Sequence, residues 1–223
     1  MALNFNVDPY YDDFNDSNNF HRILFKPGVA VQARELTQAQ SILQDQITKF
    51  ADNIFRQNSP VTGGQVTTNF NCHYVKLKAT YNETSFDVTD FNNLLVQNST
   101  GSVRARVLGT ASSTGEGGDP PTLVVSYLTQ GQFSNNDIIF DTNSNLAAQA
   151  VENDATGLSS TASISDGVFY TVGNFVQVSE STIILNKYDN TPSLRVGLTI
   201  TETVNDYIDN PSLLDPEIGR AHV

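Results

Sequence analysis

A heptad pattern between positions 33 and 54 is the feature of this sequence that most constrains its fold. Two series spaced seven residues apart interleave at spacings of three and four, as a coiled-coil seam requires. The two series together, called the seam below, are Ala33, Gln40, Ile47 and Ile54, and Leu36, Leu43 and Phe50. The pattern predicts one long amphipathic helix with a single apolar stripe.

Turn-forming residues limit this helix on both sides. Pro27-Gly28 combines a fixed φ with a residue that tolerates positive φ, so the helix begins after it. Ser59-Pro60 removes a backbone donor and disfavours helical geometry, so the helix ends before it. We predict a helix from about Gln32 to Gln57, roughly 35 to 40 Å long at 1.5 Å per residue, and assign it the segment 32–58.

Two arrangements of the helix are consistent with the seam. The helix packs against another chain as a coiled coil, or it lies on a β-sheet of its own chain, which produces almost the same stripe. Gln40 within the seam favours the first, because a polar residue there sets the register of an assembly.

Residues 1–31 read as an extended arm. The stretch from Asn4 to Asn19 has neither helical nor strand periodicity, and Pro9 interrupts it. Its aromatic residues are too numerous for a solvated tail, so we expect the arm to lie over a neighbouring surface, on this chain or another. These aromatic residues are Phe5, Tyr10, Tyr11, Phe14 and Phe20.

Two runs of the sequence resemble a known family. The run YYDDFNDSNNFHRILFKPGVAVQARELTQAQSILQDQI, from Tyr10 to Ile47, closely resembles the N-terminal signature of virion structural proteins of T4-like marine phages, especially cyanophages. A second run, from Gly167 to Pro216, is similar through a short hairpin, a TPS-R-VGL strand and a SLLDP-like segment. The resemblance implies a structural role in the tail or baseplate, and it supplies no catalytic or ligand-binding residues.

The last six residues, 218–223, read IGRAHV. This is the translation of a string that resembles a common sequencing-library adapter. Our hypothesis is an artefact that ends an N-terminal fragment of a longer protein; the alternative is a natural polar tail.

Period-two alternation predicts antiparallel strands beyond the helix. The segment 61–94 holds the first of them, a half-buried strand from His73 to Thr80. The segment 95–165 is expected to form a small antiparallel β domain, with strands at 102–108, 122–128, 137–140 and 146–151.

The segment 166–217 is predicted to begin with a hairpin of residues 169–172 and 175–178 around a Gly173-Asn174 turn. Ile183 to Leu185 continues the sheet, and Arg195 to Val204 alternates as a strand with one dry and one wet face. The predicted fold class is therefore α+β, mainly β: an arm, one long amphipathic helix and antiparallel sandwich or barrel-like domains.

Charge and composition narrow the classes of function. The 24 acidic residues outnumber the 12 basic ones, for a net charge of −12, which disfavours nucleic acid and anionic membranes as partners. No secretion signal or apolar run of about 20 residues is present. Cys72 is alone and fits a reducing compartment at synthesis.

The sequence contains no recognisable set of residues for catalysis, metal binding or cofactor binding. Apart from the tail, one cysteine and two histidines, His21 and His73, are too few for a zinc site or a nucleophile with its base. The acidic run 12–18 lacks the glycine and distal glutamate of a calcium loop, so we interpret it as a turn with Asx hydrogen bonds. We therefore expect a protein that is not an enzyme and takes no cofactor or metal.

The leading hypothesis is a tail or baseplate subunit of a phage virion, assembled in the host cytoplasm. Its partners would be other virion proteins, or further copies through the helix. The alternatives are a receptor- or carbohydrate-binding tail module, with Tyr81, Tyr127 and Phe133 available, and a tail-associated enzyme that degrades cell walls. The candidate interface residues are Leu36, Gln40, Leu43, Ile47, Phe50, Ile54, Tyr10, Tyr11, Phe14 and Phe20.

Overall fold

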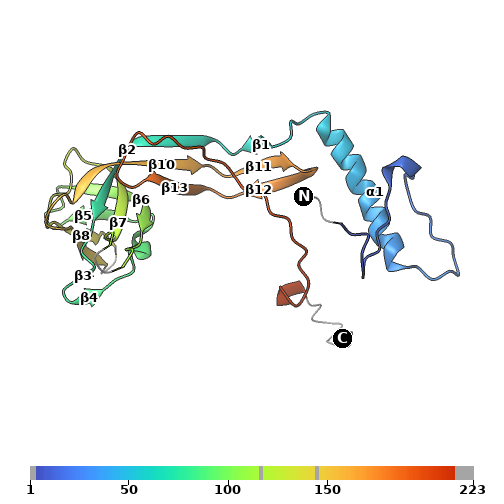
Figure 1. Ribbon diagram of the computed structural model, residues 1–223, viewed down its shortest axis with the longest axis horizontal. Coiled ribbons are helices and arrows are strands. Elements are labelled where there is room, and N and C mark those ends of the chain that lie inside the picture. Colours follow the sequence, from blue (N-terminus) through green and yellow to red (C-terminus); the bar gives the residue numbers. More distant parts are fainter. Residues whose placement is uncertain (1–3, 116–117, 144–145, 214–223) are drawn as a thin grey trace. The chain divides into compact units, whose positions relative to one another are not determined.

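The computed structural model describes residues 4–115, 118–143 and 146–213 (Figure 1). The chain forms two compact units. The helix unit comprises Met1–Ser59, Tyr170–Phe175 and Gly197–Val223, and the β unit comprises Pro60–Phe169 and Val176–Val196. Strands predominate and the described residues contain one α-helix, which confirms the predicted class of α+β, mainly β.

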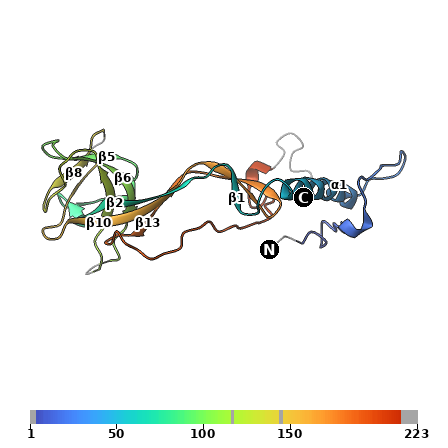
Figure 2. The ribbon, with the colours of Figure 1, turned by 90° about the horizontal axis from the view of Figure 1, so that it is seen from above.

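An eight-stranded antiparallel sheet of order β13-β10-β2-β7-β6-β5-β8-β9 forms the β unit. The sheet curls, so that Ile184 of β13 lies against Gly109 of β6, where an added Cβ would lie 3.2 Å from Ile184 Cγ1. Figure 2 shows β2, β10 and β13 running side by side. The strands are β2 Val66–Lys76, β5 Leu95–Asn98, β6 Arg104–Ala111, β7 Thr122–Tyr127, β8 Ile138–Asp141, β9 Ala147–Gln149, β10 Thr156–Ile164 and β13 Ser181–Asn186.

Shorter elements complete the fold. β3 Thr80–Tyr81 and β4 Thr84–Ser85 form a two-stranded sheet, and β1 Ser59–Gly63, β11 Gly167–Thr171 and β12 Asn174–Val178 form a three-stranded sheet of order β1-β11-β12. The 3-10 helices are η1 Asp16–Asn18, η2 Val88–Phe91 and η3 Pro211–Leu213.

One hydrophobic core fills the concave side of the eight-stranded sheet. Val75 of β2 and Leu77, just after β2, share the face that the alternation from His73 to Thr80 predicts, and both are fully buried in this core. Alternation along β6 likewise buries Val107 and leaves the arginines outward. Large fully buried members of the core include Phe91, Leu123, Val125 and Ile139.

The boundaries of the β region differ from the prediction. The strands between residues 95 and 165 do not form a sheet of their own, because β10 pairs with β2 over Thr156 to Ile164 and β7 pairs with the other side of β2. The predicted segments 61–94 and 95–165, with β13 from the segment 166–217, thus contribute to one sheet.

Two predictions in the C-terminal part were wrong. The hairpin turn comprises Val172 and Gly173, with φ of 48° and 77°, one residue earlier than expected. No strand forms between Arg195 and Val204: in the described chain, residues 192–205 have no regular secondary structure. The suspected adapter residues 218–223 lie outside the described residues.

Helix α1 spans Ala33–Asp52 and is shorter than predicted at its C-terminal end. It ends there because the Asn53 side chain donates a hydrogen bond to the Lys49 carbonyl at 2.7 Å, which satisfies one of the carbonyls that a helix end leaves free. Asn58, with φ of 62°, then turns the chain into β1. No helix among the described residues is both long and apolar enough to span a membrane.

Candidate protein–protein interface

Helix α1 carries the candidate interface, and its start is set by a reciprocal cap. The Gln32 backbone N–H donates to the Glu35 carboxylate at 3.0 Å, as in a capping box. Glu35 lies in the first turn and Lys49 in the last, where each charge suits the helix dipole. The local sequence therefore stabilises the helix independently of what covers its faces.

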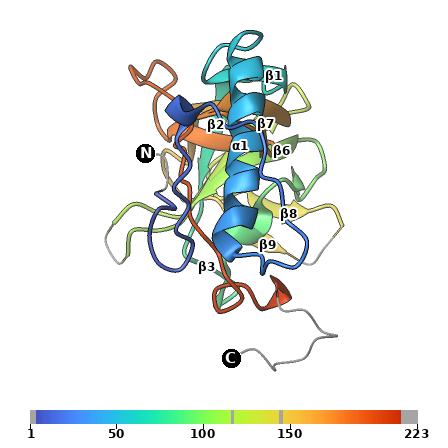
Figure 3. The same ribbon diagram turned by 90° about the vertical axis from the view of Figure 1, so that its right-hand side faces the viewer.

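The arm covers one part of α1 through polar contacts. The Ser41 hydroxyl donates to the Asp12 carboxylate, which is 8% exposed. Asp13 accepts from Gln38 at 3.1 Å and pairs with Arg34 at 3.3 Å. The arm runs alongside the helix in Figure 3. It therefore docks on its own chain, one of the two possibilities left open above.

Farther along the helix, Lys49 continues this contact. It forms ion pairs with Asp16 of the arm and, at 2.8 Å, with Asp45 of α1. The hydrogen bonds to Asp16 and Asp45 raise the pKa of Lys49. Because the lysine and Asp16 are exposed, this ion pair contributes little to stability.

The tip of the β11–β12 hairpin covers a second part of α1. The Tyr170 hydroxyl donates to Asp52 at 2.7 Å, and its ring is fully buried against Phe55 and Phe175. Burial and the adjacent Asp52 carboxylate raise the pKa of Tyr170. The Gly173 carbonyl, in the turn, accepts from Gln44 at 3.0 Å and from Thr48 at 3.3 Å.

The seam lies on the face that neither the arm nor the hairpin tip covers. All seven of its residues are exposed, and its large apolar side chains keep 40% to 69% of their surface accessible. On α1 the buried residues are instead Ile42 and Ala51. Within the described residues of the helix unit, the seam is therefore left uncovered. Ile54 extends the stripe into the turn after the helix.

The aromatic residues of the arm contribute little to its docking on α1. Tyr10, Tyr11 and Phe20 are exposed, and Phe14 is half-buried. Tyr10 packs edge-on against Phe5 with ring centroids 6.0 Å apart, within the arm itself. The docking residues that the sequence analysis missed are carboxylates, Asp12, Asp13 and Asp16. The sequence feature that could have indicated this docking is the acidic run of the arm, because the helix carries basic and amide side chains that can pair with it.

The comparisons with known proteins bear on this part of the chain. Residues 8–85 match a domain of unknown function, DUF4815. The match takes in the arm, α1 and the chain as far as β4, and so includes both the docking carboxylates and the seam. No curated protein and no solved structure is similar enough to count as a match.

Other candidate residues have ordinary structural roles. Cys72 is fully buried, which raises the pKa of its thiol, and burial lowers the pKa of the neighbouring His73. Phe133 is 2% exposed and its backbone N–H donates to the Tyr127 hydroxyl at 3.1 Å. The buried Phe133 ring is therefore not available to stack on a sugar, whereas the Tyr127 ring is half-buried.

The acidic run of the arm forms the turns predicted for it. The backbone N–H of Phe14 donates to the Asp12 carboxylate at 3.1 Å, and that of Ser17 to Asn15 at 3.0 Å. The described residues contain no group of three or more acidic, histidine or cysteine side chains placed to hold a metal ion.

Proposed function

We propose that this chain is a structural subunit of a phage virion, in the tail or baseplate, that acts through contacts between protein chains. The observation that carries the proposal is the exposed seam on a helix whose other faces already have partners. A stripe with coiled-coil spacing that is left uncovered by its own chain is suited to contact another chain.

The energy available at the seam supports this role. Full burial of one leucine, isoleucine or phenylalanine side chain stabilises a complex by about 1.5–3 kcal/mol relative to exposure. Leu36, Leu43, Ile47 and Phe50 follow one another along about four turns of α1, each at least 40% exposed. Covering them is therefore worth several kcal/mol, roughly enough to offset part of the cost of association.

The location in a virion rests on the resemblance of residues 10–47 and 167–216 to structural proteins of marine phages. The partner of the seam is another tail protein or a further copy of this chain. The acidic net charge of −12 supports a protein partner over nucleic acid.

Sedimentation of the whole chain with the other tail proteins tests the contact. We expect Leu43→Asp to weaken association at least tenfold, because the new carboxylate would have to be desolvated in the seam. Gln46→Asp is the matched control: it adds the same charge one position outside the seam and should leave association unchanged. Equal association of both variants would contradict the assignment of the seam.

The virion location has its own test. Mass spectrometry of purified particles of the source phage should detect tryptic peptides of this chain at a fixed ratio to known tail proteins. Their absence from clean particles would contradict a structural role.

A further inference from the structure

The segment from Arg195 to Val204 has the sequence of a strand and no strand partner. Val196, Leu198 and Ile200 alternate with Thr199 and Thr201. Within the described part of the chain, residues 192–205 make no backbone hydrogen bond. The three apolar side chains remain 42% to 53% exposed. A segment with one apolar face and unpaired backbone groups is suited to add as a strand to an unpaired sheet edge.

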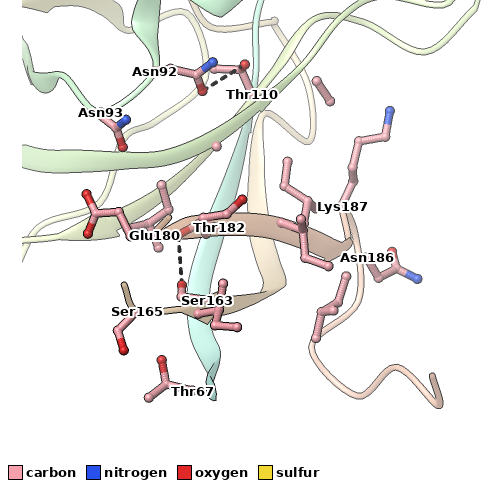
Figure 4. A pocket seen from close by; sticks show the side chains of 18 of the residues that line it. Thr67, Asn92, Asn93, Thr110, Ser163, Ser165, Glu180, Thr182, Asn186 and Lys187 are labelled. Carbon is pink, nitrogen blue, oxygen red and sulfur yellow. Dashed lines mark hydrogen bonds between the residues drawn. The ribbon is translucent and has the colours of Figure 1, made fainter. Parts of the chain in front are cut away.

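The β unit offers such an edge at β13, the outermost strand of the eight-stranded sheet. A groove of about 1160 Å³ follows this strand and is lined by every residue from Glu180 to Lys187. Figure 4 shows the groove, with Glu180 and Thr182 of this stretch beside Ser163 of β10. Because consecutive rather than alternate residues line it, the groove lies along the edge of the strand. Ile183 is 48% exposed there.

The other wall of the groove also belongs to an incompletely paired strand. Residues 108–111 of β6 line it, whereas β5 pairs with β6 only over residues 104–106. The remaining lining is rich in hydroxyl and amide groups, such as Asn92 and Thr110, and the described lining residues include no aromatic ring. This favours a polypeptide strand over a sugar as the occupant, because sugar sites use aromatic faces and β-strand addition uses backbone groups.

We propose that residues 196–201 of one copy pair as a parallel strand with β13 of a second copy, with Leu198 beside Ile183. This register places Ile200 beside Leu185, so the apolar faces of donor and acceptor coincide. It also places Arg195 beside Glu180. Neither of these two side chains forms an ion pair within the described residues, so their charges are available to each other.

The short connection and the charges of the two segments favour a second copy as the partner. Parallel neighbours in one chain need a crossover of about a dozen residues or more, and only residues 187–194 separate β13 from Arg195. An antiparallel pairing within one chain is short enough. With Leu198 beside Ile183, however, it places Arg195 beside Asn186 and Glu180 beside Thr201, so the opposite charges of Arg195 and Glu180 would not meet as they do in the parallel register.

The consequence is a head-to-tail contact. Donor segment and acceptor edge are different surfaces of the same chain, so repetition closes a ring or extends a filament. This contact does not depend on the seam of α1 and goes beyond the proposed function.

Disulfide trapping with the full chain tests the register. One preparation carries Ile183→Cys and a second, of different tag mass, carries Leu198→Cys; Cys72 stays in place because it is buried. Mild oxidation of the mixture should give a disulfide between the two chains, located by mass spectrometry at positions 183 and 198, because neighbouring side chains on one face lie within disulfide range. Thr199→Cys, which faces the other side, is the matched control and should give at least tenfold less product.

Three results would overturn the proposal: no 183–198 product from the mixture, equal product with Thr199→Cys, or a disulfide that closes within one chain carrying both cysteines independently of protein concentration. Reversing the charges at positions 180 and 195 tests the same register through the strength of association. Glu180→Arg should weaken association several-fold, and adding Arg195→Glu to it should restore association; no restoration would contradict the register.

The trapping is repeated in the Leu43→Asp background, which separates the two contacts. A 183–198 product that persists there supports strand donation even if the seam proves not to be an interface. Loss of the product in that background alone would show that strand pairing requires the seam, which contradicts its independence.

Discussion

The two units of this protein use their apolar residues in opposite ways. In the β unit, the curled sheet encloses a core in which Phe91, Leu123 and Ile139 are fully buried. In the helix unit, the arm and the hairpin tip attach to α1 largely through hydrogen bonds and ion pairs, while Leu43 and Phe50 stay exposed. The β unit thus buries its large apolar side chains in a core, whereas the helix unit leaves those of the seam exposed.

Truncating one large apolar side chain in each unit should give the largest difference in the free energy of unfolding. Phe91→Ala removes a fully buried ring and should lower the free energy of unfolding by about 3–5 kcal/mol. Leu43→Ala, measured on the monomer at low concentration, should lower it by less than about 1 kcal/mol, because the side chain is exposed. Urea unfolding followed by circular dichroism checks both. Equal losses would mean that the seam is covered by its own chain.

An intermediate effect is expected where the arm docks. Asp12→Ala leaves the Ser41 hydroxyl without its acceptor in a part-buried contact, which should cost about 1–3 kcal/mol of local stability. Amide hydrogen exchange of residues 4–22 should accelerate roughly tenfold or more while exchange in β2 is unchanged. Asn18→Ala, at an exposed position of the same arm, is the control. Unchanged exchange in the Asp12 variant would contradict polar docking of the arm.

The smallest effect concerns an ion pair of the β unit. Hydrogen bonds from Lys187 and Tyr188 lower the pKa of Asp119 below its ordinary value of 3.8. A carboxyl with a lowered pKa stabilises the folded state above its unfolded pKa and loses this contribution as the pH falls through its folded pKa. Asp119→Asn should therefore lower the free energy of unfolding by less than about 1 kcal/mol at pH 7. In strong acid, the variant and the unchanged chain should be equally stable.

Thermal unfolding between pH 7 and pH 2 measures this effect. Asp90→Asn, at an exposed carboxyl, should follow the unchanged chain at every pH. A difference for Asp119→Asn that grew as the pH fell would contradict the direction of the pKa shift.

Local periodicity explains which elements were predictable. The heptads of α1 are visible in consecutive residues, so this helix was expected close to where it forms, and β13 was expected at its central residues, Ile183 to Leu185. The alternation from His73 found only the C-terminal end of β2, which begins at Val66. β10 was missed because its sequence, TGLSSTASI, is rich in small and hydroxyl residues. Ser159 and Ser160 are nevertheless buried, since their hydroxyls donate to the carbonyls of Asn186 and Asp189 at 3.0 and 2.8 Å.

Partners that lie far away in the sequence explain what could not be predicted. The alternation from Arg195 to Val204 shows which side chains would share a face, but not whether another strand lies beside them. The arm's carboxylates meet α1 across 21 positions, for Asp13 and Arg34, to 33 positions, for Asp16 and Lys49, and periodicity within a short stretch does not reveal such pairs. The seam itself was found from the sequence, but its exposure became evident only when the contacts of the other helix faces were known.

Photo-cross-linking from the two faces of α1 tests the central claim most directly. A benzophenone amino acid replaces Leu43 in the seam or Ser41 on the face that contacts the arm. We predict that the probe at position 43 links to another protein chain, and that the probe at position 41 links to the arm near Asp12 of its own chain. Cross-links from position 43 that fall only within its own chain would contradict the account.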